Sequence, residues 1–234
     1  MSAEGLDVVV TFDLFSALTD SRSGAGRTLD RLAAQRGWQV GGHDVYDVWD
    51  RRHKAAQRAC TEWVPYDVLA RASLEEAYLE LRLDGDAEGD LDQLLGSLPE
   101  WPLWNDVATA LPVLAQRYRV GLLSNVDDRH FRRTAASAYV PPELAMTSER
   151  LRAYKPSPAI YRRAQAALGR MVHVASSARD VRGCLEAGIP VVRLRRPGHE
   201  LDPDGPRPTL EVGGIGDLEA AVQQAATQES LRQE

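Results

Sequence analysis

The sequence has 234 residues, of which 44% are hydrophobic and 26% charged, and this composition is typical of a globular protein. A chain of this length forms one large domain, or a core with a small accessory unit. Its 34 acidic and 28 basic residues give a formal net charge of −6, which argues against a general nucleic-acid binder because such proteins need a basic surface. The apolar runs are too short for a membrane span, which needs about 20 residues, so we expect no membrane partner.

Two further features bear on the cellular compartment. The N-terminal segment carries Glu4 and leads directly into an apolar run, which is not the pattern of a signal peptide. The two cysteines, Cys60 and Cys184, lie far apart in the sequence and are too few for a disulfide framework or a metal-ligand cluster. We therefore expect a protein of the reducing cytoplasm.

Short apolar runs, typical of parallel strands that are buried on both faces, recur along the chain. They predict strands at residues 6–12, 120–123, 173–175 and 189–194, with a weaker candidate at 144–147. Amphipathic segments that suit helices lie at 106–118, 128–138, 158–168, 178–187 and 218–226. This alternation predicts an α/β fold with a parallel sheet and helices on both faces.

The interval from about residue 24 to residue 100 has a different pattern, without a convincing strand. Four helical stretches fit it, at 25–37, 43–60, 66–82 and 87–97. In the third stretch, apolar residues follow the i, i+3, i+4, i+7 spacing of one helix face, at Leu74, Ala77, Tyr78 and Leu81. The sequence therefore predicts a helical insertion of roughly 75 residues between the first strand and the rest of the sheet.

Polar residues follow the expected strands at the points where ligands bind in sheets of this kind, beyond the carboxyl ends of the strands. Asp13 follows the strand expected at 6–12, Ser124 and Asn125 follow that at 120–123, and Asp180 follows that at 173–175, while Lys155 lies just before the helix expected at 158–168. Each has an ordinary explanation when taken alone: Asp13 as a turn residue, Lys155 as a surface charge, and Asp180 as a favourable charge at a helix N-terminus. Together they would place two carboxylates, a hydroxyl, an amide and an ammonium on one rim of the sheet.

The order of these residues resembles the four motifs of the haloacid dehalogenase-like hydrolase superfamily: a nucleophilic Asp, a Ser or Thr, a Lys and an acidic residue. The resemblance covers nearly the whole chain and implies a three-layer α/β/α, Rossmann-like core. It assigns residues 1–22 and 100–234 to this core. Residues 23–99 would form a helical cap of the family's first type, inserted between the first two motifs. The resemblance also implies that Asp13, Lys155 and Asp180 are catalytic.

Within the superfamily, the sequence is most similar to the 2-haloacid dehalogenases. Phosphatase members carry a second Asp two positions after the nucleophile, and an acidic residue that helps hold Mg²⁺ four positions before the last Asp. Here these positions are Phe15 and Ser176. The dehalogenases have an aromatic residue and a Ser there and use no metal, and their active-site tyrosine six residues after the lysine matches Tyr161. The resemblance therefore implies no cofactor, and Mg²⁺ only if the protein is a phosphatase.

The implied reaction is hydrolysis of a small 2-haloacid, an anionic small molecule, through an ester on Asp13 that water then cleaves. Lys155 would balance the charge of Asp13, and Asp180 would position Lys155 and the water. Ser124 and Asn125 would hold the substrate carboxylate or the hydrogen bonds of the site. Further substrate contacts are expected from Phe15, Trp49, Arg51, Tyr161 and Ser177. The family resemblance is also compatible with a homodimer.

Three positions depart from the dehalogenase pattern. Ala17 stands where that branch has Thr, Ser177 where it has Asn, and Asp50 follows Trp49 where a cap arginine receives the halide. Arg51 is the candidate for that arginine, although a shift of one residue turns a side chain by about 100° on a helix. Two alternatives therefore stay open: a phosphohydrolase of a small phosphate ester, and a catalytically impaired binding or regulatory protein with the same fold.

Overall fold

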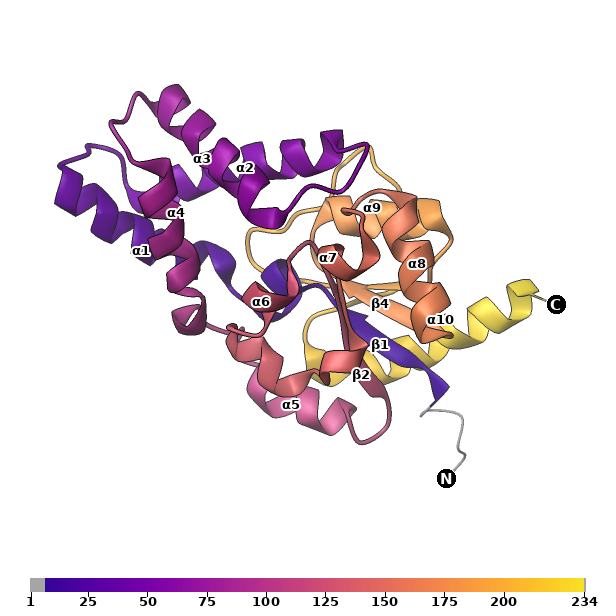
Figure 1. Cartoon of the computed structure of the whole chain (residues 1–234). Coiled ribbons are helices and arrows are strands. Elements are labelled where there is room, and N and C mark those ends of the chain that lie inside the picture. Colours follow the sequence, from indigo (N-terminus) through magenta and orange to yellow (C-terminus); the bar gives the residue numbers. More distant parts are fainter. Residues whose placement is uncertain (1–6, 234) are drawn as a thin grey trace.

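The computed structural model describes residues 7–233 and contains a six-stranded sheet in which all paired strands run parallel (Figure 1). The strands are β1 (Val9–Phe12), β2 (Arg119–Ser124), β3 (Ala145–Thr147), β4 (Met171–Ala175), β5 (Val191–Leu194) and β6 (Glu211–Val212). Their spatial order is β3-β2-β1-β4-β5-β6, so the order reverses between β1 and β4. Such a switch point leaves a crevice at the carboxyl ends of the two strands. Glu4 and residue 6, the start of the first expected strand, lie outside the described residues.

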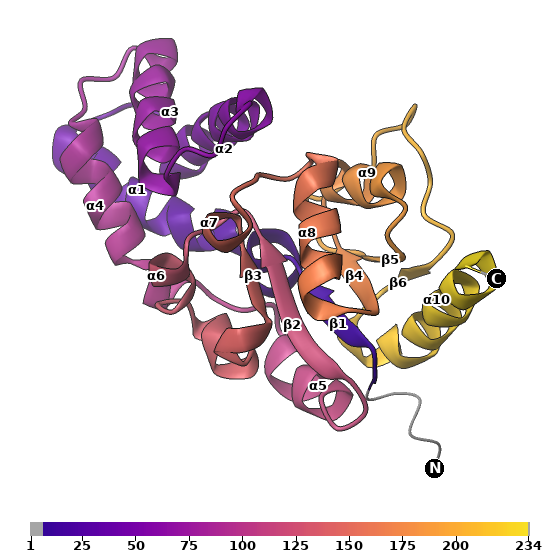
Figure 2. The same ribbon diagram turned by 45° about the vertical axis from the view of Figure 1, so that its right-hand side comes forward.

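Helices cover both faces of the sheet, which confirms the three-layer α/β/α architecture. The core helices are α5 (Val107–Leu114), α6 (Asp128–Phe131), α7 (Ser148–Leu151), α8 (Pro158–Leu168), α9 (Ala178–Ala187) and α10 (Leu218–Gln233). Val10 and Phe12 of β1 pack in one apolar cluster with α5 and α10, whereas Val9 packs in a second cluster with α8 and α9. Figure 2 shows α5 and α10 on one side of the strands and α8 on the other. Because successive side chains of a strand point to opposite faces, the apolar runs are buried on both sides.

Residues 21–96 form the four expected helices of the insertion: α1 (Ser21–Arg36), α2 (Gly42–Ala59), α3 (Tyr66–Leu81) and α4 (Ala87–Gly96). They pack around an apolar cluster of their own and lie beyond one end of the sheet, as Figure 1 shows. Helices α1 and α2 approach so closely that a Cβ atom on Gly42 would lie 2.1 Å from the backbone nitrogen of Asp30, so this contact requires glycine. We call these helices the cap; the boundary at 23–99 stays a prediction.

Several segments differ from the sequence expectations. The helix expected at 106–118 spans only Val107–Leu114, and it contains Pro112, which cannot donate a backbone hydrogen bond. The segment expected at 128–138 is divided into α6 and a 3₁₀ helix, Ala135–Tyr139. The last helix continues beyond 226 to Gln233, and β6, with two residues, was too short to expect from periodicity. The other 3₁₀ helices are Leu98–Glu100, Pro142–Leu144 and Ile215–Asp217.

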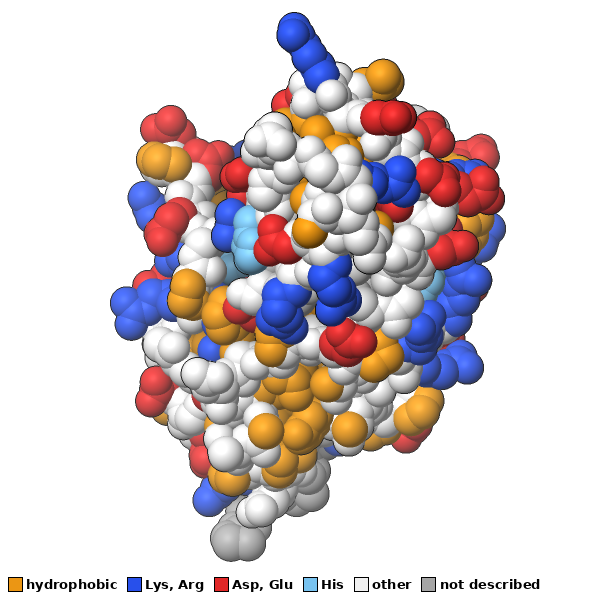
Figure 3. Space-filling view, turned by 90° about the vertical axis from the view of Figure 1, so that its left-hand side faces the viewer, with side chains coloured by type: hydrophobic (Ala, Val, Ile, Leu, Met, Phe, Trp, Pro, Cys, Tyr) orange, Lys and Arg blue, Asp and Glu red, His pale blue; other side chains and the backbone are white. Residues whose placement is uncertain are grey.

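The surface carries charged side chains of both signs. On the face shown in Figure 3, basic and acidic side chains are interspersed, and an apolar area lies in its lower half. Large apolar side chains that are exposed among the described residues include Val68, Leu79 and Val113. Within residues 7–233, none of the helices has both the length and the apolar character that crossing a membrane requires.

Candidate active site

Asp13 lies immediately after β1, and its carboxylate accepts four hydrogen bonds. Oδ2 accepts from the backbone nitrogen of Ser16 at 2.9 Å and from its hydroxyl at 2.6 Å, so Asp13 caps the short π-helix Leu14–Leu18. Oδ1 accepts from Lys155 Nζ at 2.7 Å and from the Ser124 hydroxyl at 3.0 Å. Burial alone would raise the pKa of Asp13, but the charge of Lys155 and these hydrogen bonds hold the pKa below its ordinary value of 3.8. The carboxylate is therefore ionised at neutral pH, as a nucleophile must be.

Lys155 lies between two carboxylates and uses all three donors of its ammonium group. Nζ donates to Oδ1 of Asp13 at 2.7 Å, to Oδ2 of Asp180 at 2.5 Å and to the carbonyl of Leu123 at 2.9 Å. Burial would lower the pKa of this 2% exposed lysine, but the charges of Asp13 and Asp180 outweigh burial and raise the pKa above 10.5. Lys155 is therefore a fixed cation that compensates the charge of Asp13.

Asp180, in the first turn of α9, is held from behind by two buried side chains. The Tyr161 hydroxyl donates to Oδ1 at 2.7 Å, and Nε2 of His173 lies 3.1 Å from Oδ2. Burial would raise the pKa of Asp180, but Lys155 and His173 outweigh it and the pKa lies far below 3.8. His173 is fully buried in β4, and its Nδ1 lies 2.9 Å from the Thr11 hydroxyl, so it is a histidine of the core.

Asn125 connects the core to the cap. Its amide nitrogen donates to Oε1 of Gln57 in α2 at 2.8 Å and to the carbonyl of Lys155 at 3.0 Å. Its amide oxygen accepts from the backbone nitrogen of Lys155 at 2.7 Å. The neighbouring Ser124 hydroxyl is bound to Asp13. Both side chains hold internal hydrogen bonds of the site, one of the two roles expected from the sequence, and their contact with a substrate stays a prediction.

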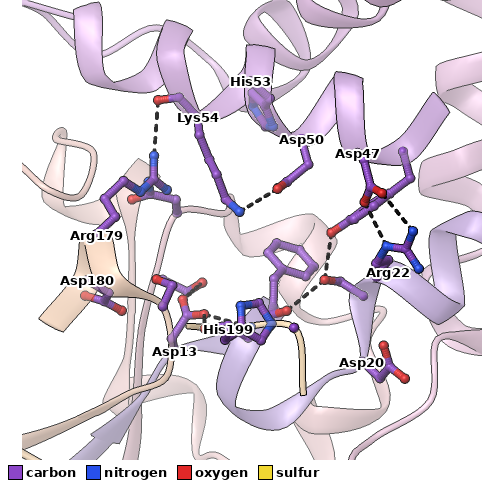
Figure 4. A pocket seen from close by; sticks show the side chains of 18 of the residues that line it. Asp13, Asp20, Arg22, Asp47, Asp50, His53, Lys54, Arg179, Asp180 and His199 are labelled. Carbon is purple, nitrogen blue, oxygen red and sulfur yellow. Dashed lines mark hydrogen bonds and ion pairs between the residues drawn. The ribbon is translucent and has the colours of Figure 1, made fainter. Parts of the chain in front are cut away.

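A pocket of about 400 Å³ lies between the cap and the carboxyl ends of the strands, and Asp13 is part of its wall (Figure 4). All but two of the site residues predicted from the sequence line this pocket: Asp13, Phe15, Trp49, Ser124, Asn125, Lys155, Ser177 and Asp180. The two that do not are Arg51 and Tyr161. The crevice at the switch point thus carries a buried ionised carboxylate, a compensating ammonium and space for a small molecule.

The sequence matches the family model of haloacid dehalogenase-like hydrolases over residues 8–188. The chain belongs to this family. It is similar to the solved structure of a defluorinating L-2-haloacid dehalogenase, with 26% identity and a TM-score of 0.77 over 92% of this chain and 95% of that chain. It is also similar to the L-2-haloacid dehalogenase from Xanthobacter autotrophicus, with 20% identity and a TM-score of 0.78 over 93% of this chain and 98% of that chain.

A further solved structure is that Xanthobacter enzyme with chloropropionic acid covalently bound, at 20% identity and a TM-score of 0.75 over 93% of this chain and 98% of that chain. These likenesses confirm the resemblance to the haloacid dehalogenase-like superfamily and to its 2-haloacid dehalogenase branch. The comparison with curated proteins found no match.

Arg51 lies outside the pocket of this haloacid dehalogenase-like hydrolase, so the structure corrects the prediction that it contacts substrate. Its guanidinium donates to Oε1 of Glu80 at 2.5 Å, and its side chain is 58% exposed. Arg51 follows Trp49 by two residues on α2, so its side chain is rotated by about 200° around the helix axis from that of Trp49. It therefore points away from the cavity that Trp49 lines. Asp50 faces the cavity instead, bound to Lys54 Nζ at 2.5 Å.

Tyr161 is also placed differently from the prediction. It is fully buried in the core, is not among the residues that line the pocket, and its hydroxyl binds Asp180 at Oδ1 and at the backbone carbonyl. Gly183 allows this approach, because a Cβ atom there would lie 2.5 Å from the Tyr161 hydroxyl. The structure thus places Tyr161 against Asp180 and outside the pocket lining, where it can position that carboxylate.

Sequence reasoning missed a second set of pocket residues, which includes His53, Lys54, Gln57, Arg179 and His199. Helical spacing could have found two of them, because His53 and Gln57 follow Trp49 at i+4 and i+8 on the same face of α2. Burial, together with the charges of Arg179 and Lys54, lowers the pKa of His53 to about 3, so this imidazole is neutral. His199 gave no local signal, because it lies in a loop after β5.

The donor set around Asp13 does not fit the Mg²⁺ of the phosphatase branch. Mg²⁺ prefers oxygen ligands that include carboxylates. Phe15 and Ser176 provide no carboxylate at the two positions where the phosphatases have acidic residues. The carboxylates of Asp13 and Asp180 are already bound to Lys155. We therefore derive no chemical step through a metal ion.

Proposed function

We propose that the protein hydrolyses the carbon–halogen bond of a 2-haloacid without a metal ion, with Asp13 as the nucleophile. The observation that carries this proposal is the position of Lys155 Nζ, 2.7 Å from Asp13 and 2.5 Å from Asp180. The ammonium compensates the charge of the nucleophile directly, and Phe15 and Ser176 stand where phosphatase members carry the second Asp and the acidic residue that helps hold Mg²⁺. The similarity to a defluorinating L-2-haloacid dehalogenase, and to an enzyme solved with chloropropionic acid covalently bound, supports the same reaction class.

The first step forms an ester on Asp13. A carboxylate oxygen attacks the carbon that bears the halogen, the new C–O bond forms, and the halide leaves with the electron pair of the C–halogen bond. Each oxygen of the Asp13 carboxylate accepts two hydrogen bonds in the structure, so the attacking oxygen must first lose one of them. The Ser16 hydroxyl can turn away by rotation about its Cα–Cβ bond, whereas Lys155 is fixed by three acceptors. Oδ2 is therefore the attacking oxygen.

The second step hydrolyses the ester. Water adds to Cγ of Asp13, the bond from Cγ to Oδ2 breaks, and Oδ2 leaves as the hydroxyl oxygen of the 2-hydroxyacid, while the oxygen of the water stays in the carboxylate of Asp13. One proton of the water goes to the leaving oxygen and the other is released, so Asp13 returns as a carboxylate. Asp180 is a weak base because its pKa lies far below 3.8. Its part is to hold Lys155 in place and to orient the water.

The test is a single-turnover reaction in ¹⁸O-water with excess enzyme and a panel of 2-haloacids, followed by digestion and mass analysis of the peptide that contains Asp13. Halide release with one heavy oxygen in that peptide is the expected result, and Asp13→Asn should give neither. Halide release without label in the peptide would overturn the ester on Asp13.

Two other outcomes would replace the proposal. Mg²⁺-dependent turnover of small phosphate esters without halide release would establish a phosphohydrolase. Equal inactivity of the wild type and Asp13→Asn on both substrate classes would establish a catalytically impaired binding or regulatory protein.

A further inference from the structure

Arg179 is a pocket cation that lacks a carboxylate partner. It precedes Asp180 in α9, and its side chain reaches from the core to the cap (Figure 4). Nη1 donates to the carbonyl of Lys54 at 3.1 Å and Nη2 to Oε1 of Gln57 at 3.2 Å, and both acceptors are neutral groups of α2. Within residues 7–233 the structure shows no ion pair of Arg179. These two bonds fix the direction of the guanidinium without neutralising it.

The other lysine and arginine side chains that line the pocket are compensated. Lys155 lies between two carboxylates, Lys54 binds Asp50 at 2.5 Å, and Arg22 forms two hydrogen bonds with Asp47, at 2.8 and 2.7 Å. A guanidinium offers five donors, of which the bonds to α2 use two in Arg179. Burial of an uncompensated cation is costly, and burial does lower the pKa of Arg179. An anion bound in the pocket would supply the missing partner.

The net charge of Asp13, Lys155 and Asp180 also indicates that an anionic substrate needs a further cation in the pocket. Asp13, Lys155 and Asp180 together carry a net charge of −1, so an anionic substrate is repelled unless another cation lies nearby. The side chains of Ser124 and Asn125, the first candidates for the substrate carboxylate, are engaged in bonds to Asp13, Lys155 and Gln57. Arg179, with donors that the bonds to α2 leave free, lines the same pocket.

The apolar part of the pocket is aromatic and roomy. Phe15 packs on Trp101 with ring centroids 5.8 Å apart, and Tyr46 packs edge-on against Trp49 at 5.9 Å; all four line the cavity. The pocket volume of about 400 Å³ lies within the range of roughly 300–1,000 Å³ that is usual for small-molecule pockets. A three-carbon acid would fill only a small part of it.

We propose that Arg179 binds the carboxylate of the substrate, and that the remainder of the substrate is an apolar group larger than that of propionate, packed against the aromatic wall. The inference rests on the proposed function for the reaction itself. Binding can be tested apart from the reaction, because acids without a halogen have nothing for Asp13 to displace.

Isothermal titration calorimetry on the wild-type protein would use propionate, 3-phenylpropionate and the uncharged 3-phenylpropionamide. We expect 3-phenylpropionate to bind at least tenfold more tightly than either of the others. Arg179→Gln should weaken the binding of 3-phenylpropionate by tenfold or more and leave the affinity for 3-phenylpropionamide unchanged. Arg179→Lys should keep part of the preference for the acid over the amide. The matched control is Arg22→Gln, an arginine of the same pocket that Asp47 already neutralises, and it should change the affinity less than twofold.

Several results would overturn the inference. Equal weakening of acid and amide by Arg179→Gln would show that Arg179 only holds the cap in place. The role of Arg179 in binding the carboxylate would be ruled out by any of three results. These are an unchanged affinity in Arg179→Gln, an equal loss of affinity in Arg22→Gln, and a wild type that binds neither carboxylate. Propionate binding as tightly as 3-phenylpropionate would remove the larger apolar group. These results would leave the halide and ¹⁸O measurements on Asp13 standing, so the two proposals can fail separately.

Discussion

Nζ of Lys155 lies 2.7 Å from Oδ1 of Asp13, and both side chains are buried at the carboxyl ends of the central strands. Of the 28 basic residues, only Lys54 and Lys155 are lysines. An ammonium is compact and has three donors, which match the three acceptors around it: Asp13, Asp180 and the carbonyl of Leu123. A planar guanidinium is larger and has a different donor geometry. The site therefore gives a physical reason for a lysine at position 155 in a chain that otherwise uses arginine.

Replacing Lys155 with methionine would leave the carboxylates of Asp13 and Asp180 buried without their cation. Removal of one partner of a buried ion pair costs about 3–5 kcal/mol, so we expect Lys155→Met to lose about that much free energy of unfolding and all turnover. Urea denaturation followed by circular dichroism measures the loss. The matched control is Lys54→Met, whose 41% exposed side chain pairs with Asp50 and should cost less than about 1 kcal/mol. Equal losses in the two variants would contradict the central role of Lys155.

Stability at acid pH should report on the same carboxylates. The pKa of Asp13 and that of Asp180 are lowered in the folded protein, so the unfolded chain takes up these protons first as the pH falls. Their contribution is fully present above the unfolded pKa of 3.8 and is lost as the pH falls through the folded values. We expect Asp13→Asn to have a shallower loss of stability than the wild type below about pH 4, by up to about 1.4 kcal/mol per pH unit. Parallel curves from urea denaturation across this range would refute the lowered pKa of Asp13.

Much of this site could be predicted because it depends on strand ends. Parallel strands end on one edge of a sheet, so residues that follow different strands meet even when they lie far apart in sequence. Asp13 and Asp180 meet Lys155 in this way. The cap helices were predictable for a similar reason, because a buried face needs apolar residues at helical spacing, as at Leu74 and Ala77 of α3.

The sequence could not show how the cap is rotated over the core. That rotation depends on tertiary contacts such as the one between Gln57 and Asn125, which no local pattern encodes. Asp50 and Arg51 point in different directions on α2, and it is Asp50 that lines the pocket. The resemblance to the dehalogenases likewise implied that Tyr161 lies in the site, but it could not tell on which side of Asp180 the ring lies.

In the proposed mechanism, the Ser16 hydroxyl competes with the attack by Oδ2 of Asp13. It donates to Oδ2 at 2.6 Å, while the backbone nitrogen of the same residue holds Oδ2 at 2.9 Å. Ser16→Ala removes only the first bond, so we expect halide release in a single turnover to become faster, by up to about tenfold for about 1.4 kcal/mol. Ser124→Ala is the matched control, because it frees Oδ1, the oxygen that does not attack, and should slow the step. If both variants slow halide release equally, the Ser16 hydroxyl orients Asp13 and does not restrain it.

Tyr161→Phe separates a positioning role from a substrate contact. The ring keeps its place in the core, but Oδ1 of Asp180 loses a donor at 2.7 Å. A buried acceptor left without its partner costs about 1–3 kcal/mol of stability, and the pKa of Asp180 should rise towards 3.8. Since Tyr161 does not line the pocket, steady-state kinetics should show a lower kcat with KM unchanged. A raised KM with kcat intact would mean that the tyrosine contacts the substrate, as the sequence alone predicts, and that the pocket in the working enzyme extends past Asp180.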